Sequence, residues 1–158
     1  MSKTRFITQA AVIAALYAAL TIIFQPVSFL QTQVRVSEGL TVLPIFTPAA
    51  IPGLFLGCLI ANIFSPVGIL DVILGSLATL IAAVVTYKMP KPYLAPIPPI
   101  VINGIVIGSL LNYVMNLPLV PSMLWVALGQ AITCYGLGYP LILILNKLKD
   151  KVFFRGQV

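Results

Sequence analysis

Few side chains in this sequence could perform chemistry. The chain has no histidine and only three acidic residues, Glu38, Asp71 and Asp150. Histidine is the usual general base and the commonest metal ligand, so its absence argues against both roles. Cys58 and Cys134 lie in hydrophobic runs without zinc-ligand spacing, which favours simple apolar packing. We therefore expect neither an enzyme nor a metal site.

The remaining polar candidates would bind a solute rather than transform it. Asp71 lies within a hydrophobic run, and an ionisable residue inside a membrane span usually has a partner or a function. Arg35 and Glu38 either form a surface ion pair of little energetic value or contribute to binding. Three amides either bond across helices or contact the solute, and one indole either anchors at the membrane interface or stacks on a ring. These side chains are Asn112, Asn116, Gln130 and Trp125.

The composition shows which kind of protein must position these residues. Hydrophobic residues make up 60% of the 158 residues and charged residues 8%, against roughly 25% charged in soluble domains. A mean hydropathy of +1.10 leaves too little polar material for a water-exposed surface, so the solvent must be the bilayer. We interpret the first hydrophobic stretch, 6–24, as a retained helix rather than a cleaved leader. The net charge of +6 comes from residues near helix ends, which argues against nucleic-acid binding.

Basic residues mark the helix ends that we expect in the cytoplasm. They form three clusters, and if all three are cytoplasmic, the chain crosses the membrane an even number of times between them. Closely spaced prolines at 44, 48 and 52 break the hydrophobic run 40–64 into two helices, which makes the count even. The clusters are Lys3 and Arg5, then Lys88 and Lys91, then Lys147, Lys149, Lys151 and Arg155.

The predicted fold is therefore an all-α, polytopic membrane protein with both termini in the cytoplasm. It forms a single transmembrane domain over residues 1–158, with a polar outer loop at 25–36. The short second helix cannot cross about 30 Å of hydrocarbon alone, so its broken end must be buried against protein or water. Such irregular backbone often lines a binding cavity, and we expect a site beneath the outer loop that opens to the outside. The six predicted helices cover 5–24, 37–47, 49–64, 67–87, 95–115 and 119–146.

The first helix carries a run of alanines at one-turn spacing. Small residues such as Ala11, Ala15 and Ala19 make a smooth stripe on which another helix can pack closely. The pattern alone is compatible with packing inside the same bundle or with docking of a separate membrane subunit.

Four blocks of sequence resemble the QueT family, the substrate-binding S components of energy-coupling factor (ECF) importers. The resemblance covers nearly the whole chain. It implies a six-helix S-component fold in a bacterial cell membrane, a membrane scaffold (T) subunit that docks at the alanine stripe, and two separate ATPase subunits. ATP would bind to those subunits, because no loop ending in Gly-Lys-Ser or Gly-Lys-Thr occurs here. The blocks are VRVSEGLTVLPIFTPAAIPGLF (34–55), LDVILGSLATLIAA (70–83), LAPIPPIVIN (94–103) and GQAITCYGLGYPL (129–141).

The resemblance also implies the solute, a queuosine precursor with a 7-deazaguanine base. A carboxylate can accept hydrogen bonds from the adjacent N–H donors on one edge of a guanine-like base. Either Glu38 or Asp71 would supply this carboxylate. The other acid would meet an aminomethyl cation if the solute carries one. One of the three amides would donate to the ring carbonyl. Trp125 or Tyr113 would stack on the base, for roughly 1–3 kcal/mol.

Two other readings of the residues stay open. One is a self-sufficient ion-coupled carrier that uses Asp71 and Glu38 as proton sites, although the short chain shows no evident internal repeat. The other is a structural membrane protein without a ligand, whose polar residues only join helices.

Overall fold

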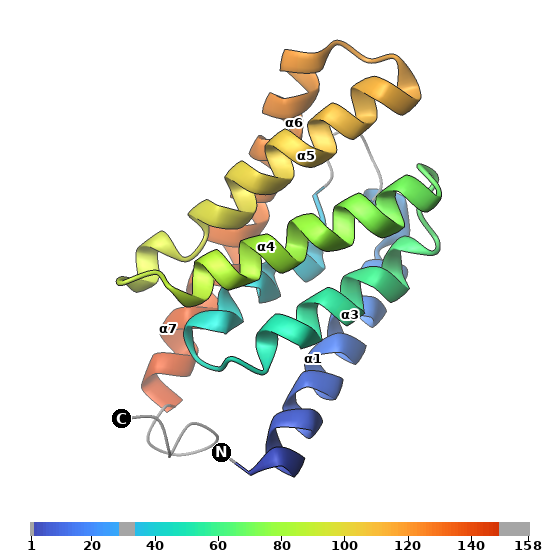
Figure 1. Cartoon of the computed structure of the whole chain (residues 1–158). Helices are drawn as coiled ribbons and strands as arrows, with labels where there is room; N and C mark the ends of the chain where they lie inside the picture. Colours follow the sequence, from blue (N-terminus) through green and yellow to red (C-terminus); the bar gives the residue numbers. More distant parts are fainter. Residues whose placement is uncertain (1, 29–33, 149–158) are drawn as a thin grey trace.

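A computed structural model describes residues 2–28 and 34–148 of the chain. Within these two ranges the protein is all-helical and has no β-strand, which confirms the predicted all-α class (Figure 1). The elements are α1 (Lys3–Ile23), α2 (Gln25–Ser28), the 3₁₀ helix η1 (Val36–Ile45), α3 (Ala50–Asn62), the π-helical turn η2 (Asp71–Gly75), α4 (Ser76–Tyr87), the 3₁₀ turn η3 (Pro92–Leu94), α5 (Ile97–Met115), α6 (Leu119–Thr133), the π-helical turn η4 (Cys134–Gly138) and α7 (Tyr139–Leu148).

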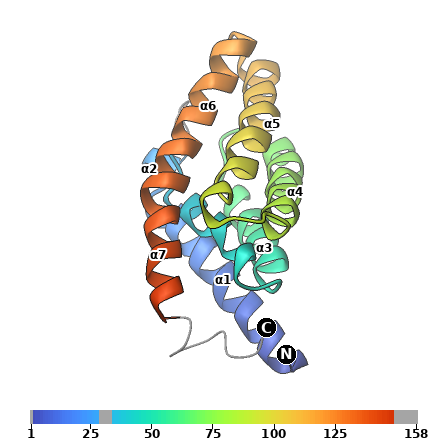
Figure 2. The same ribbon diagram turned by 90° about the vertical axis from the view of Figure 1, so that its left-hand side faces the viewer.

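Six helical segments run up and down one bundle. They are α1, η1, α3, η2 with α4, α5, and the continuous run from α6 through η4 to α7. The start of α1, the end of α7 and the connection between α4 and α5 lie toward one end of the bundle, and the turn between α5 and α6 lies at the other (Figures 1 and 2). Basic residues of all three clusters lie toward the end of the bundle that holds the start of α1 and the end of α7. Lys149, Lys151 and Arg155 of the last cluster lie outside the described residues.

The observed segments begin and end within a few residues of the sequence-based ones. The fourth starts later than expected, because residues 66–68 form a turn before the π-helical turn η2. The outer loop predicted at 25–36 begins with the short helix α2, and its residues 29–33 lie outside the described part of the chain.

The sides of this bundle are largely apolar, whereas the charged residues Arg35, Glu38 and Asp71 are buried inside it and the exposed lysines lie near helix ends. Large hydrophobic side chains such as Ile23, Ile69 and Val120 are more than 60% exposed. Within the described part of the chain, three helical stretches are long and apolar enough to span a membrane, namely Lys3–Ile23, Pro92–Met115 and Leu119–Leu148. An apolar exterior around a polar interior fits a membrane protein, because lipid tails and not water surround its outer side chains.

The short 3₁₀ helix η1 lies at the centre of the bundle. Every residue from Val34 to Ala50 is buried or partly buried, so no turn of this segment faces outward. Pro44 lies within η1 and has no backbone N–H to donate, which suits this tight, short helix better than a long α-helix. Its neighbours thus cover the irregular backbone, as a hydrocarbon environment requires.

Helices α1 and α3 pack closely because glycine faces alanine. A Cβ atom on Gly53 would lie 2.8 Å from the carbonyl oxygen of Ala10, and one on Gly57 would lie 2.8 Å from that of Ala14. Together with Ala18, these alanines form the buried face of α1. Ala11, Ala15 and Ala19 form a second row, about 100° around the helix from the first, and are exposed.

Candidate functional site

Glu38 is a buried acidic residue of the central segment η1 and is 1% exposed. The hydroxyl of Tyr17, from α1, donates a 2.5 Å hydrogen bond to Glu38 Oε1. On the other side, Nδ2 of Asn103, from α5, donates to Glu38 Oε2 over 3.4 Å. Two helices far apart in sequence therefore present polar groups to one carboxylate.

The backbone of Glu38 is held by the last helical segment and by η1 itself. Thr41 Oγ1 donates to the Glu38 carbonyl at 2.6 Å, and Cys134 Sγ lies 3.5 Å from the same oxygen. Cys134 belongs to the π-helical turn η4, and its sulfur also lies 3.8 Å from Oε1 of Gln130. Gln130 is buried, so the structure brings this predicted residue into the surroundings of Glu38.

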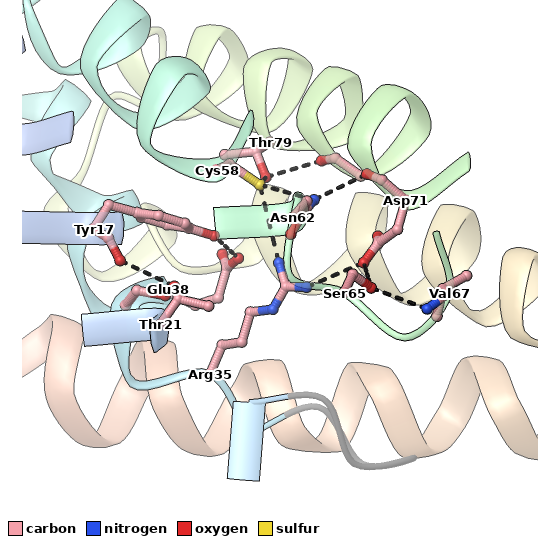
Figure 3. A network of polar contacts seen from close by, with 12 residues as sticks. Tyr17, Thr21, Arg35, Glu38, Cys58, Asn62, Ser65, Val67, Asp71 and Thr79 are labelled. Atoms are coloured by element: carbon pink, nitrogen blue, oxygen red, sulfur yellow. Dashed lines mark hydrogen bonds and ion pairs between the residues drawn. The ribbon is translucent and has the colours of Figure 1, made fainter. Parts of the chain in front are cut away.

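Arg35 and Asp71 form a second buried group beside the first. The two side chains are 3% and 0% exposed, and Arg35 Nη2 lies 3.4 Å from Asp71 Oδ2. Ser65 Oγ donates to the same carboxylate oxygen at 2.6 Å. Figure 3 shows the guanidinium of Arg35 between Asp71 and Cys58, with Glu38 facing Tyr17 nearby. Of the two alternatives for Arg35 and Glu38, the exposed surface pair is ruled out, because both residues are buried and Arg35 forms an ion pair with Asp71.

The π-helical turn η2 sets the position of Asp71. A π turn shifts the helix ladder by one residue, and such turns are frequent at functional sites. The displaced carbonyl of Asp71 accepts a 2.9 Å hydrogen bond from Nδ2 of Asn62. Gly75 leaves room for the carboxylate, since a Cβ atom there would lie 2.5 Å from Asp71 Oδ1. The loop between α3 and α4 and its π turn thus hold the acid inside the bundle.

Three buried side-chain oxygens in the two polar groups accept no hydrogen bond from the described residues. They are the Oδ1 atoms of Asp71, Asn62 and Asn103. Buried polar atoms without partners are rare and cost free energy. Arg35 forms an ion pair with Asp71, and the Glu38 carboxylate accepts hydrogen bonds from the neutral groups of Tyr17 and Asn103. Such a site suits a ligand with several N–H donors.

The other predicted site residues lie around the turn between α5 and α6. Asn112 Nδ2 donates to the carbonyl of Leu117 at 2.5 Å, and Asn116 ends α5 in the left-handed conformation with φ 54°. Tyr113 is 78% exposed and Trp125 is 53% exposed. No hydrogen bond between described residues joins these four side chains to Glu38 or Arg35. Their contact with a solute stays a prediction.

Sequence reasoning missed Tyr17, Asn103 and Ser65. Each carries a lone polar group in or beside an apolar stretch, which is a weak signal because such groups often only join helices. Tyr17 follows Ile13 and Ala14 on one helix face, so its hydroxyl had to meet a partner inside the bundle. Nothing in the sequence identifies Glu38 as that partner.

Comparison with known protein families gives one match. The model of a family described as QueT transporter matches residues 7–147, which is nearly the whole chain. No curated protein matches, and no solved structure matches.

Proposed function

This chain belongs to the QueT family of transporters, so its role is transport across a membrane, and we propose that it is the substrate-binding S component of an ATP-driven ECF importer. In this proposal it captures a queuosine precursor, a 7-deazaguanine base, outside a bacterial cell. The family match confirms the resemblance found in the sequence, and it supports transport rather than catalysis.

The observation that carries the proposed substrate is the buried set of acceptors around Glu38. A guanine-like base offers a ring N–H and an exocyclic amine on one edge, and carboxylate and amide oxygens accept such donors. Glu38 lies where α1, η1 and α5 meet, and Asn103 Oδ1 beside it has no partner among the described residues. In the neighbouring group around Arg35, Asp71 Oδ1 and Asn62 Oδ1 have none either. A flat base with several donors would satisfy such acceptors.

The proposed topology has six crossings with both termini in the cytoplasm. The up-and-down path of the bundle and the basic residues toward one end support it (Figure 1). The short segment η1 crosses only as part of the bundle, because the surrounding helices cover its backbone. The solute then enters from the opposite end, where α2 and the turns at 66–68 and 116–118 lie.

The proposed partners are a T scaffold subunit, which contacts this chain directly, and two ATPase subunits that bind the ATP. The exposed alanines Ala11, Ala15 and Ala19 support docking, because the buried face of α1 is occupied by α3 and this second face is not. A smooth helix face lets another helix approach closely in the membrane. No cofactor belongs to the chain itself in this proposal.

Calorimetric titration of the purified chain in detergent tests the substrate assignment. The ligands are 7-deazaguanine, its 7-aminomethyl form and guanine. Saturable binding of a deazaguanine without ATPase subunits is the expected result. A folded chain that binds none of the three would refute the proposed substrate and leave the family assignment intact.

A further inference from the structure

Asn103 is a buried amide that uses only half of its hydrogen-bonding capacity. It lies in the first half of α5 and is 3% exposed. Its Nδ2 donates to Glu38 Oε2, whereas its Oδ1 has no partner among the described residues. An amide placed only to join two helices would gain from satisfying both atoms, because an unpaired buried acceptor costs free energy.

The two oxygens of Glu38 are used unequally. Oε1 accepts a short bond of 2.5 Å from Tyr17, while the contact from Asn103 to Oε2 is long at 3.4 Å. The acceptor capacity that remains is therefore on the side of Asn103. Glu38 Oε2 and Asn103 Oδ1 belong to side chains that contact each other, and both are acceptors that a flat ligand with two adjacent donors would match.

We propose that Asn103 is a specificity-determining residue that contacts the ligand together with Glu38. In this arrangement Glu38 Oε2 accepts the ring N–H of the base, and Asn103 Oδ1 accepts one N–H of the neighbouring exocyclic amine. The pair recognises a flat heteroaromatic ring with two adjacent N–H donors, and it discriminates against a ring that lacks the amine. This inference rests on the proposed function and adds the residue that reads the 2-amino group.

A structural role for Asn103 makes a different prediction. If the amide only ties α5 to η1, its loss weakens binding of every base by the same factor. If it contacts the exocyclic amine, its loss weakens the aminated base selectively. The ratio of two affinities therefore separates the two roles, which a single affinity does not.

The experiment measures the affinity of the full-length chain for 7-deazaguanine and for 7-deazahypoxanthine, which lacks the 2-amino group. For the unchanged protein we expect a preference for 7-deazaguanine of roughly tenfold to a hundredfold, as for loss of a hydrogen bond to a buried site. In Asn103→Ala the preference should fall by about tenfold. Ser109→Ala is the matched control on α5, because its hydroxyl donates only to its own helix, at the Ile105 carbonyl.

Each possible result either supports or overturns the proposed contact of Asn103 with the ligand. A preference that falls by about tenfold in Asn103→Ala and is unchanged in Ser109→Ala supports the assignment. A preference that persists in Asn103→Ala overturns it and leaves the proposed function standing. A folded, unchanged chain that binds neither base overturns both. If Asn103→Ala does not fold, Asn103→Leu replaces it, since an apolar side chain of similar size removes the amide without leaving a large cavity.

Discussion

At the scale of single residues, the two buried acids have different surroundings. Asp71 is bound by Arg35 and Ser65, and its backbone is fixed by Asn62. Glu38 is contacted through its side chain by Tyr17 and Asn103. We infer that Asp71 mainly holds the structure and that Glu38 mainly meets the ligand.

Replacing Asp71 by Asn should destabilise the protein strongly. The change leaves the Arg35 guanidinium buried without its opposite charge, which costs on the order of 3–5 kcal/mol. The double variant Arg35→Met with Asp71→Leu should recover part of that loss, because it removes both charges. Thermal denaturation in detergent measures both effects. A single variant as stable as the unchanged protein would contradict the structural role of the pair.

Replacing Glu38 by Gln should weaken ligand binding more than it weakens the fold. Gln has nearly the same shape and keeps an acceptor for the hydroxyl of Tyr17, but it loses the charge that strengthens bonds to the ligand's N–H groups. We expect the affinity for 7-deazaguanine to fall roughly tenfold to a hundredfold, measured by calorimetry. Affinity within a factor of about two of the unchanged protein would remove Glu38 from the site.

At the scale of elements, helix α1 has two alanine faces with different environments. Ala10, Ala14 and Ala18 pack inside the bundle, where α3 approaches through glycine. Ala11, Ala15 and Ala19 face outward. The same helix also carries Tyr17, so one element connects the exposed face with the candidate site.

A larger side chain at the contact between α1 and α3 should destabilise the fold. In Gly57→Ala the added Cβ would lie 2.8 Å from both the Ala14 carbonyl oxygen and Tyr17 Cβ, which forces α1 and α3 apart. Overpacking of this kind costs typically about 1–3 kcal/mol. The denaturation midpoint should therefore fall. Gly136→Ala is the control, because nothing lies within 4 Å of a Cβ atom there.

Enlarging the outer face should affect assembly instead. Ala15→Leu adds bulk to an exposed stripe, so it should leave the denaturation midpoint nearly unchanged and reduce co-purification with the T subunit. Ile105→Phe enlarges an exposed residue of α5 and serves as the control. Unchanged co-purification of Ala15→Leu would place the docking surface elsewhere on the chain.

At the scale of the whole molecule, the apolar exterior and the polar centre suit a binding subunit in a membrane. The sequence contains no loop ending in Gly-Lys-Ser or Gly-Lys-Thr, which agrees with the proposal that ATP binds to separate ATPase subunits. The ion-coupled alternative needs Asp71 and Glu38 as proton sites, but Asp71 is already paired with Arg35.

Uptake into lipid vesicles separates these two functions. We expect a labelled deazaguanine to accumulate only when the T and ATPase subunits and ATP are present with this chain. Vesicles that hold the chain alone, with a proton or sodium gradient, are the control. Accumulation in that control would favour the ion-coupled carrier over the importer subunit.

The sequence by itself determined the membrane character and the helical class. The hydrophobic fraction, the proline breaks near Pro44 and Pro48, and the basic clusters depend only on composition and order along the chain. These features predicted six helical segments and a short second one, and the resemblance in four blocks predicted the family that the comparison then matched.

Only the tertiary structure decided which polar residues meet. Arg35 and Asp71 are 36 residues apart, and Asn103 and Glu38 are 65 apart, so their contacts depend on how helices are rotated against each other. That rotation is hard to read from this sequence, because a helix in lipid is apolar on every side and its pattern does not mark the inner face. For the same reason the spacing of the alanines in α1 left open which row faces inward, and the close approach of Gly53 and Gly57 settled it.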